Sequence, residues 1–196
     1  MNPREAQVDE LLVQRMRRGD AVAFAALATR YWNAAHRIGW NMLPDPSAAA
    51  ELAESAVLSA LRSAEEVSRD LPFRTSLYRQ AMSESLIRLH SVPSSVPRSL
   101  GAFLPRFDPR GRLTSPGTDW SECGEAAFGR RDVGEGIRKT LQHLDALDRA
   151  AFVLREIEQL SVEEAAAVLG ISPESIRQRT HRAFLILTGF LGTLAA

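Results

Sequence analysis

The sequence predicts an all-α protein with two small helical domains joined by a long linker, the second domain containing a helix-turn-helix. Apolar residues recur every three or four positions through residues 8–90 and 144–187, with no alternating pattern of the kind that strands show. Between these parts, residues 91–135 hold five of the ten prolines and show no sustained helical period. We therefore expect one domain at residues 1–90, a linker at residues 91–135 and a second domain at residues 136–196.

The composition excludes several kinds of protein and of functional site. The 24 basic and 24 acidic side chains cancel, so any affinity for DNA must come from a local patch or from a partner. The single cysteine, Cys123, excludes an internal disulfide, and neither a metal-ligand spacing nor a phosphate-binding or nucleophile motif is present. No apolar run approaches the length of a membrane span, and the charged N-terminus lacks a signal-peptide core. We expect a cytoplasmic protein that is not an enzyme, without catalytic residues, metal, cofactor or membrane insertion.

The first domain carries start and stop signals for four helices. Glycine ends a helix readily, aspartate caps the next one, and proline cannot continue a helix. On these signals we expect a first helix that ends at Gly19, a second from Asp20 to Pro44, a third from Pro46 to about Val67, and a fourth over residues 73–90.

The second domain contains the signals of two short-linked helices. Ser161 and Glu164 form a capping box, which predicts a helix that begins at position 162. Gly170 permits the left-handed backbone that ends this helix. Ser172 then caps a second helix, with Pro173 at its first position, where a missing amide proton costs nothing. Two helices joined by about three residues around a glycine form the helix-turn-helix pattern.

The second of these helices has one apolar and one polar face. Its apolar stripe consists of Ile176, Thr180, Ala183 and Leu187. The outward face carries Glu174, Arg177, Gln178, His181 and Arg182. Arginine and glutamine can form paired hydrogen bonds with guanine and adenine edges in a major groove. A solvated basic face is the alternative, but the cap, turn and donor-rich face in one unit favour DNA binding.

Residues 144–183 resemble region 4 of the extracytoplasmic-function (group IV) sigma factors of bacterial RNA polymerase, in the sigma-70 family. The matching positions are Leu144, Arg149, Phe152, Leu154, Arg155, Glu156, Leu160, Ser161, Glu163, Glu164, Ala166, Leu169, Gly170, Ile171, Ile176, Arg177, Arg179, His181, Arg182 and Ala183. The resemblance implies that this domain reads the promoter −35 element. The implied DNA-contacting residues are Glu174, Ser175, Arg177, Gln178, His181 and Arg182.

The first domain resembles region 2 of the same family. The opening helices match at Gly19, Asp20, Ala23, Phe24, Leu27, Arg30 and Tyr31. The resemblance implies a core-polymerase-binding surface at Glu51, Leu52, Glu54, Ser55 and Leu58. It implies a −10-reading segment at Phe73, Arg74, Thr75, Tyr78, Arg79, Met82 and Ser83. Ser76 departs from the family, which usually has tryptophan there, so the face that melts DNA is less aromatic than is usual.

The two resemblances together imply a sigma factor that binds core RNA polymerase and directs promoter-specific initiation. Its partners would be core RNA polymerase and promoter DNA, and sequestration by an anti-sigma protein is common in the family. Two alternatives stay open. One is a stand-alone helix-turn-helix regulator, and the other is a sigma-like polymerase-binding protein that melts promoters weakly.

Overall fold

The computed structural model describes residues 3–66, 72–90, 109–110 and 137–194, and this part of the chain contains helices and no strand. The first half forms α1 (Pro3–Met16), α2 (Ala21–Met42), α3 (Ala48–Glu66) and α4 (Phe73–His90). The second half begins with a helical turn over residues 137–141, followed by α6 (Ala146–Phe152), the π-helix η2 (Val153–Ile157), α7 (Val162–Leu169) and α8 (Pro173–Leu194). The all-α prediction is confirmed.

The local signals at the helix ends act as the sequence predicts. The carboxylate of Asp20 accepts hydrogen bonds from the backbone N–H groups of Val22 and Ala23, which caps α2. Ser161 and Glu164 form the reciprocal capping box of α7. Gly170 has a φ of 66°, in the left-handed region, and ends α7. The expected end of the third helix, Val67, lies outside the described residues.

Helices α2 and α3 pack closely at a glycine. A Cβ atom placed on Gly39 would lie 2.8 Å from the Cα atom of Ala49, a distance too short for any side chain. The small residues at both positions therefore let the two backbones approach. This contact fixes the angle between α2 and α3 and so the position of the α3 surface.

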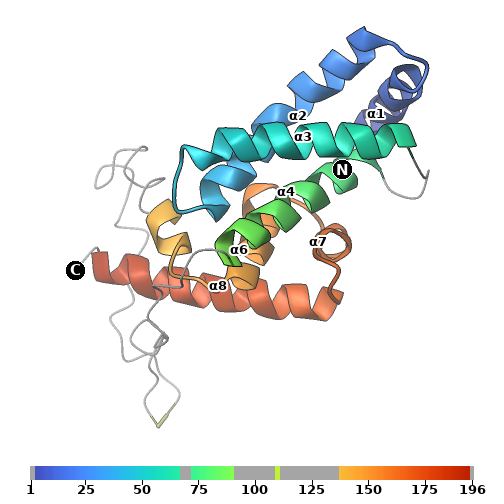
Figure 1. Ribbon diagram of the computed structural model, residues 1–196. Coiled ribbons are helices and arrows are strands. Elements are labelled where there is room, and N and C mark those ends of the chain that lie inside the picture. Colours follow the sequence, from blue (N-terminus) through green and yellow to red (C-terminus); the bar gives the residue numbers. More distant parts are fainter. Residues whose placement is uncertain (1–2, 67–71, 91–108, 111–136, 195–196) are drawn as a thin grey trace, which may run out of the picture.

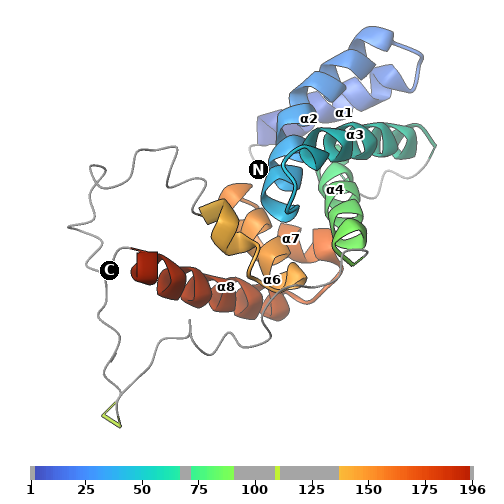
Figure 2. The same ribbon diagram turned by 60° about the vertical axis from the view of Figure 1, so that its left-hand side comes forward.

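Two apolar clusters form the core. One lies within the first half and contains Leu27 and Leu61. The other joins the two halves, since it contains Ile38 and Met82 together with Leu154. In both views α4 lies between α3 and the C-terminal helices, and it packs against α7 (Figures 1 and 2). Apart from residues 109–110, the predicted linker at residues 91–135 and Cys123 within it lie outside the described residues.

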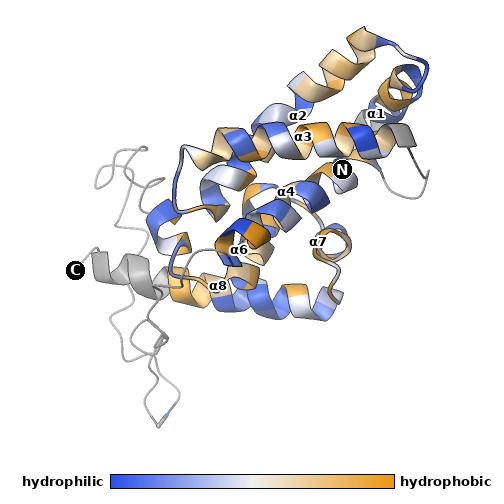
Figure 3. Ribbon diagram, viewed as in Figure 1, coloured by the Kyte–Doolittle hydropathy of each residue, from blue (hydrophilic) through white to orange (hydrophobic). Residues whose placement is uncertain are grey.

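Helix α8 has the two-faced character that its sequence predicts. Ile176 and Ala183 are fully buried and Leu187 nearly so, whereas Thr180 is half-buried. The first half of α8 is mostly hydrophilic where it is turned away from α6 and α7 (Figure 3). None of the helices searched in the described part of the chain combines the length and the apolar character that crossing a membrane requires.

Candidate nucleic-acid and polymerase interfaces

The polar face of α8 presents side chains to solvent. Arg177, Gln178 and His181 are exposed, and Ser175 is half-buried beside the cap residue Ser172. Glu174 accepts hydrogen bonds from the Arg177 guanidinium at 3.4 Å and from the Gln178 amide at 3.2 Å. These are bonds within one exposed helical turn, which water or a base edge can replace at little cost. The side chains of this face can therefore form new hydrogen bonds without any rearrangement of the helix-turn-helix.

Arg182 has a second attachment that the sequence did not suggest. Its Nε and Nη2 atoms donate to the two carboxylate oxygens of Asp148 in α6, at 2.6 and 2.8 Å. Arg179 donates to the same carboxylate at 2.9 Å. The Asp148 side chain is 1% exposed, and its hydrogen bonds raise the pKa of Arg182. Asp148 therefore sets the position of α8 against α6, and Arg182 is held by this contact while about half of its side chain remains exposed.

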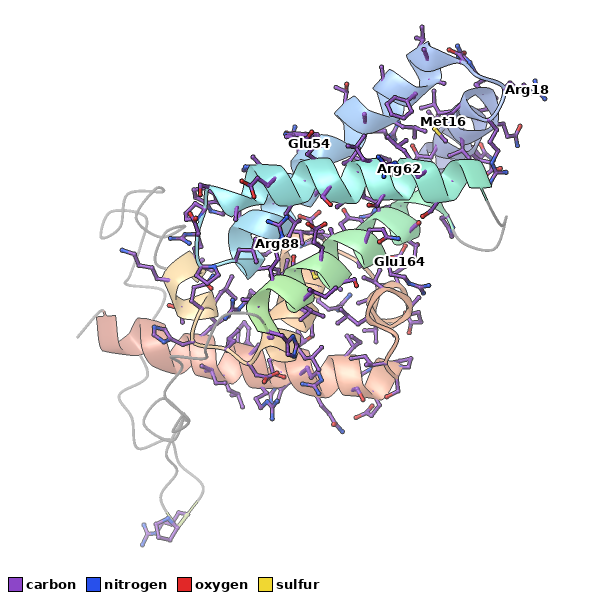
Figure 4. The ribbon with its side chains drawn as sticks, in the orientation of Figure 1. Met16, Arg18, Glu54, Arg62, Arg88 and Glu164 are labelled. Carbon is purple, nitrogen blue, oxygen red and sulfur yellow. The ribbon has the colours of Figure 1, made fainter. Side chains whose placement is uncertain are left out.

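The expected polymerase-binding surface lies on α3. Glu54 is exposed, and it lies on the edge of α3 turned away from α4 (Figure 4). Leu58 is 37% exposed and Ser55 is half-buried. Glu51 is exposed and forms an ion pair of 3.6 Å with Arg88 of α4. Leu52 is fully buried in the core, so it supports this surface from below and is not part of it.

The residues expected to read the −10 element divide into buried and accessible groups on α4. Phe73, Tyr78 and Met82 are buried, Arg74 and Thr75 are half-buried, and Arg79 and Ser83 are exposed. A DNA strand cannot reach the three buried side chains in this conformation. The expectation that they contact DNA therefore requires a different arrangement of the surrounding helices.

The C-terminal half contacts the accessible part of α4 at Arg74 and Arg79, while Ser83 and much of Arg79 stay exposed. The Arg79 guanidinium donates to the backbone carbonyl of Ala167 in α7 at 2.6 Å. Arg74 donates to the backbone carbonyl of Glu158 at 3.3 Å, and Glu164 of α7 lies next to α4 (Figure 4). The Tyr78 hydroxyl donates to the Glu158 carboxylate at 2.8 Å. Burial, together with the charge of Glu158, raises the pKa of Tyr78 to about 12.

No group of three or more histidine, cysteine, aspartate or glutamate residues in the described part of the chain is placed to hold a metal ion. The faces of α8, α3 and α4 instead carry hydrogen-bonding groups, charges and apolar side chains. Such chemistry is suited to binding macromolecules.

A family model matches part of the C-terminal half of the chain, and individual proteins match it over nearly its whole length. The family model described as Sigma-70, region 4 matches residues 135–187, which include α6, η2, α7 and the first two-thirds of α8. RNA polymerase sigma-H factor of Pseudomonas aeruginosa is 28% identical over 184 residues, which make up 89% of each chain. ECF RNA polymerase sigma-E factor of Escherichia coli strain K12 is 27% identical over 183 residues, 91% of this chain and 92% of that relative. Over nearly its whole length the chain is similar to sigma factors of the extracytoplasmic-function type.

One solved structure has the same fold. CnrH, determined in complex with the cytosolic domain of CnrY, superposes on this chain with a TM-score of 0.66 at 21% identity. The match covers 94% of this chain and 97% of CnrH. The arrangement of helices is therefore shared with CnrH over both halves.

Sequence reasoning missed two buried acids, Asp148 and Glu158. The side-chain partners of each carboxylate lie at least 31 residues away in the sequence. The sequence offered one indication of this. Asp148 and its neighbour Arg149 are charged residues within a helical pattern whose other positions are mostly apolar. The π-helix η2, which sets the position of Glu158, has no recognisable sequence signature.

Proposed function

We propose that this sigma factor binds core RNA polymerase and gives it promoter specificity, with α8 reading the −35 element. The observation that carries the proposal is the match to named sigma factors over both halves, which a plain helix-turn-helix regulator would not require. In this role the chain is a specificity subunit and needs no catalytic residue or cofactor. Its place of action would be the cytoplasm, where polymerase and DNA meet.

On α8 we assign the reading of bases and the holding of phosphates to different residues. The exposed amide of Gln178 and the guanidinium of Arg177 have the donor geometry for base edges. His181 is exposed one turn further along, where it is placed for a phosphate. Glu174 and Ser175 lie at the start of the helix, and Arg182 would act mainly by holding the helix on Asp148.

On α3 we assign core-polymerase binding to the exposed surface around Glu54, Ser55 and Leu58. An exposed leucine beside carboxylates suits a partner surface that is apolar with a basic rim. Glu51 would contribute less, because Arg88 already compensates its charge. Binding of the −10 strand is assigned to α4 through Arg74, Thr75, Arg79 and Ser83, with Phe73, Tyr78 and Met82 shaping the helix from the core.

The experiment that tests the proposed function is run-off transcription with purified core polymerase and this protein on a pool of linear genomic fragments. A sigma factor produces transcripts that begin at discrete sites, and core polymerase alone does not. Capture of core polymerase without discrete transcripts would favour a sigma-like protein that melts promoters weakly. Failure to bind core polymerase, together with specific duplex binding, would favour the stand-alone regulator.

A further inference from the structure

Glu174 lies at the start of the polar face of α8, among the residues that we assign to the reading of bases. It is the one acidic residue in the sequence of α8, whereas the outward face also carries Arg177 and His181. A carboxylate on this face lowers the affinity for the phosphate backbone, because phosphates repel it and attract the arginines. General attraction to DNA therefore does not account for Glu174.

The position of Glu174 is that of a base-contacting residue. In a helix-turn-helix, the N-terminal residues of the second helix contact base edges in the major groove. Glu174 is the second residue of α8, and its side chain is 65% exposed. Arg177 and Gln178 follow three and four positions later, so the three side chains lie on one stripe of the helix. A major groove that admits Gln178 therefore also brings Glu174 close to the bases.

Glu174 is bonded to both of these neighbours and keeps acceptor capacity. Its Oε2 atom accepts from the Arg177 guanidinium at 3.4 Å, and its Oε1 atom accepts from the Gln178 amide at 3.2 Å. An ionised carboxylate has about four acceptor positions, so roughly two of them remain for another donor. The carboxylate can therefore accept a hydrogen bond from a base while it holds Arg177 and Gln178 in place.

The chemistry of the carboxylate selects the base. An ionised carboxylate only accepts hydrogen bonds, so it needs a base with an amino group in the major groove, which cytosine and adenine supply. Adenine places the acceptor N7 beside its amino group, and the lone pair of N7 repels the carboxylate. Cytosine presents its N4 amino group and no acceptor of its own. Cytosine is therefore the base that Glu174 fits.

We propose that Glu174 determines specificity at one base pair of the duplex, by accepting a hydrogen bond from the N4 amino group of a cytosine. At a cytosine this bond offsets the cost of bringing the carboxylate into the groove. At any other base the charge stays unpaired beside the phosphates, so binding weakens. The inference rests on the proposed function of α8, and it names the base that the first turn of this helix reads.

The spacing on α8 also places this cytosine relative to the base read by Gln178. Glu174 and Gln178 lie about 6 Å apart along the helix axis, since each residue adds about 1.5 Å. Successive base pairs lie about 3.4 Å apart. The cytosine should therefore lie one or two base pairs from the position at which Gln178→Ala loses its base preference.

The test compares the duplexes that the full chain selects from a random-sequence pool with those that Glu174→Gln selects. The unchanged chain should enrich a sequence with cytosine at this position. A glutamine amide matches the two polar groups of adenine, so Glu174→Gln should replace the cytosine by adenine and leave the other positions unchanged. Such a gain of a new base cannot come from loss of folding. Glu54→Gln, which removes an exposed acid on α3, is the matched control and should select the same sequence as the unchanged chain.

Fluorescence anisotropy at one fixed salt concentration then measures the same preference on two defined duplexes. One is the selected duplex, and in the other a thymine·adenine pair replaces the cytosine·guanine pair. The unchanged chain should bind the selected duplex about tenfold more tightly than the substituted one. Glu174→Ala should reduce this ratio to below about twofold, and it should bind the substituted duplex more tightly than the unchanged chain does, because the repulsion from phosphates is removed.

The outcomes separate the reading of a base from simpler roles of the carboxylate. An equal rise in affinity for both duplexes, with the selected sequence unchanged, would overturn the proposal, because Glu174 would then only repel phosphates. An equal loss on both would also overturn it, since Glu174 would then only support Arg177 and Gln178. Selection of no sequence by the unchanged chain would overturn base reading by α8 as a whole, and run-off transcription reports separately on the proposed function.

Discussion

Helices α8 and α4 carry the two expected DNA-reading faces, and the structure leaves one open and covers the other. On α8 the polar groups of Arg177 and Gln178 bond to Glu174, within their own helical turn. On α4 the corresponding groups of Arg74 and Arg79 are bonded to the C-terminal half. The difference teaches that a helix-turn-helix is complete as a local unit, whereas the availability of the α4 face is set by how the two halves are arranged.

The largest effect is expected from Asp148→Ala, which would remove the support that keeps the α8 face in position. Arg179 and Arg182 would lose the carboxylate that both of them contact. We expect the free energy of unfolding to fall by about 2 to 4 kcal/mol, below the full value for a buried pair because Arg182 can rehydrate. Urea unfolding followed by circular dichroism measures this.

The matched control for Asp148 is Glu163→Ala, which removes an exposed acid on α7. Its free energy of unfolding should change by no more than about 0.5 kcal/mol. An equal, small change in both variants would mean that Asp148 does not hold α8.

A smaller effect, confined to DNA binding, is expected from Gln178→Ala. Its side chain is exposed and bonded only to Glu174, so the free energy of unfolding should stay the same. Binding to a duplex selected by the protein from a random pool should weaken by about 1 to 3 kcal/mol, as for the loss of one paired base contact. Fluorescence anisotropy measures both this duplex and a scrambled one. Equal loss on the two duplexes would indicate a phosphate contact, and no loss on either would exclude Gln178 from the interface.

The smallest effect concerns the pH dependence of the covered face. Burial holds the pKa of Tyr78 at about 12 in the folded chain, while an unfolded tyrosine ionises near 10. The folded state therefore keeps a proton that the unfolded state loses, and stability must fall as the pH rises through this window. By pH 11 the contribution of Tyr78 to this loss should be about 1 kcal/mol.

Absorbance at 295 nm follows the ionisation of Tyr31 and Tyr78, the two tyrosines of the chain. The pKa of Tyr31 is also raised, by its own burial and by Asp9, so neither tyrosine should titrate at its ordinary pH. Tyr78→Phe should reduce the loss of stability, and Glu158→Gln should lower the pH at which Tyr78 ionises. Titration of Tyr78 near pH 10 in the unchanged chain would contradict a closed arrangement.

The sequence was a good guide wherever neighbouring residues determine the structure. Asp20, Ser161 and Gly170 act within a few residues of their own position, so the helix ends that they set could be read directly. The exposed face of α8 followed from helical spacing alone. Family resemblance extended the reading to the surface on α3, where Glu54 and Leu58 are indeed exposed.

The sequence was a poor guide wherever residues far apart in the chain determine the structure. Glu158 and Arg37 are 121 residues apart, and nothing local marks either as half of a buried pair. Helical spacing on α4 could not show that Tyr78 and Met82 would be buried, because the surface that buries them belongs partly to the other half. The π-helix has the composition of an ordinary α-helix, so the position of Glu158 could not be predicted.

The central claim is that the α4 face is covered in the free chain and uncovered in the complex with core polymerase. The distance between α3 and α7, measured without and with core polymerase, tests this claim most directly. The chain would carry nitroxide labels at Ala50→Cys on α3 and Glu163→Cys on α7 in a Cys123→Ser background. Pulsed electron resonance would measure it alone and after addition of core polymerase, and the same sample would then be assayed for run-off transcription. We predict a short distance for the free chain and a longer one in a holoenzyme that starts transcripts at discrete sites. A distance that stays short in a transcribing holoenzyme would contradict the account.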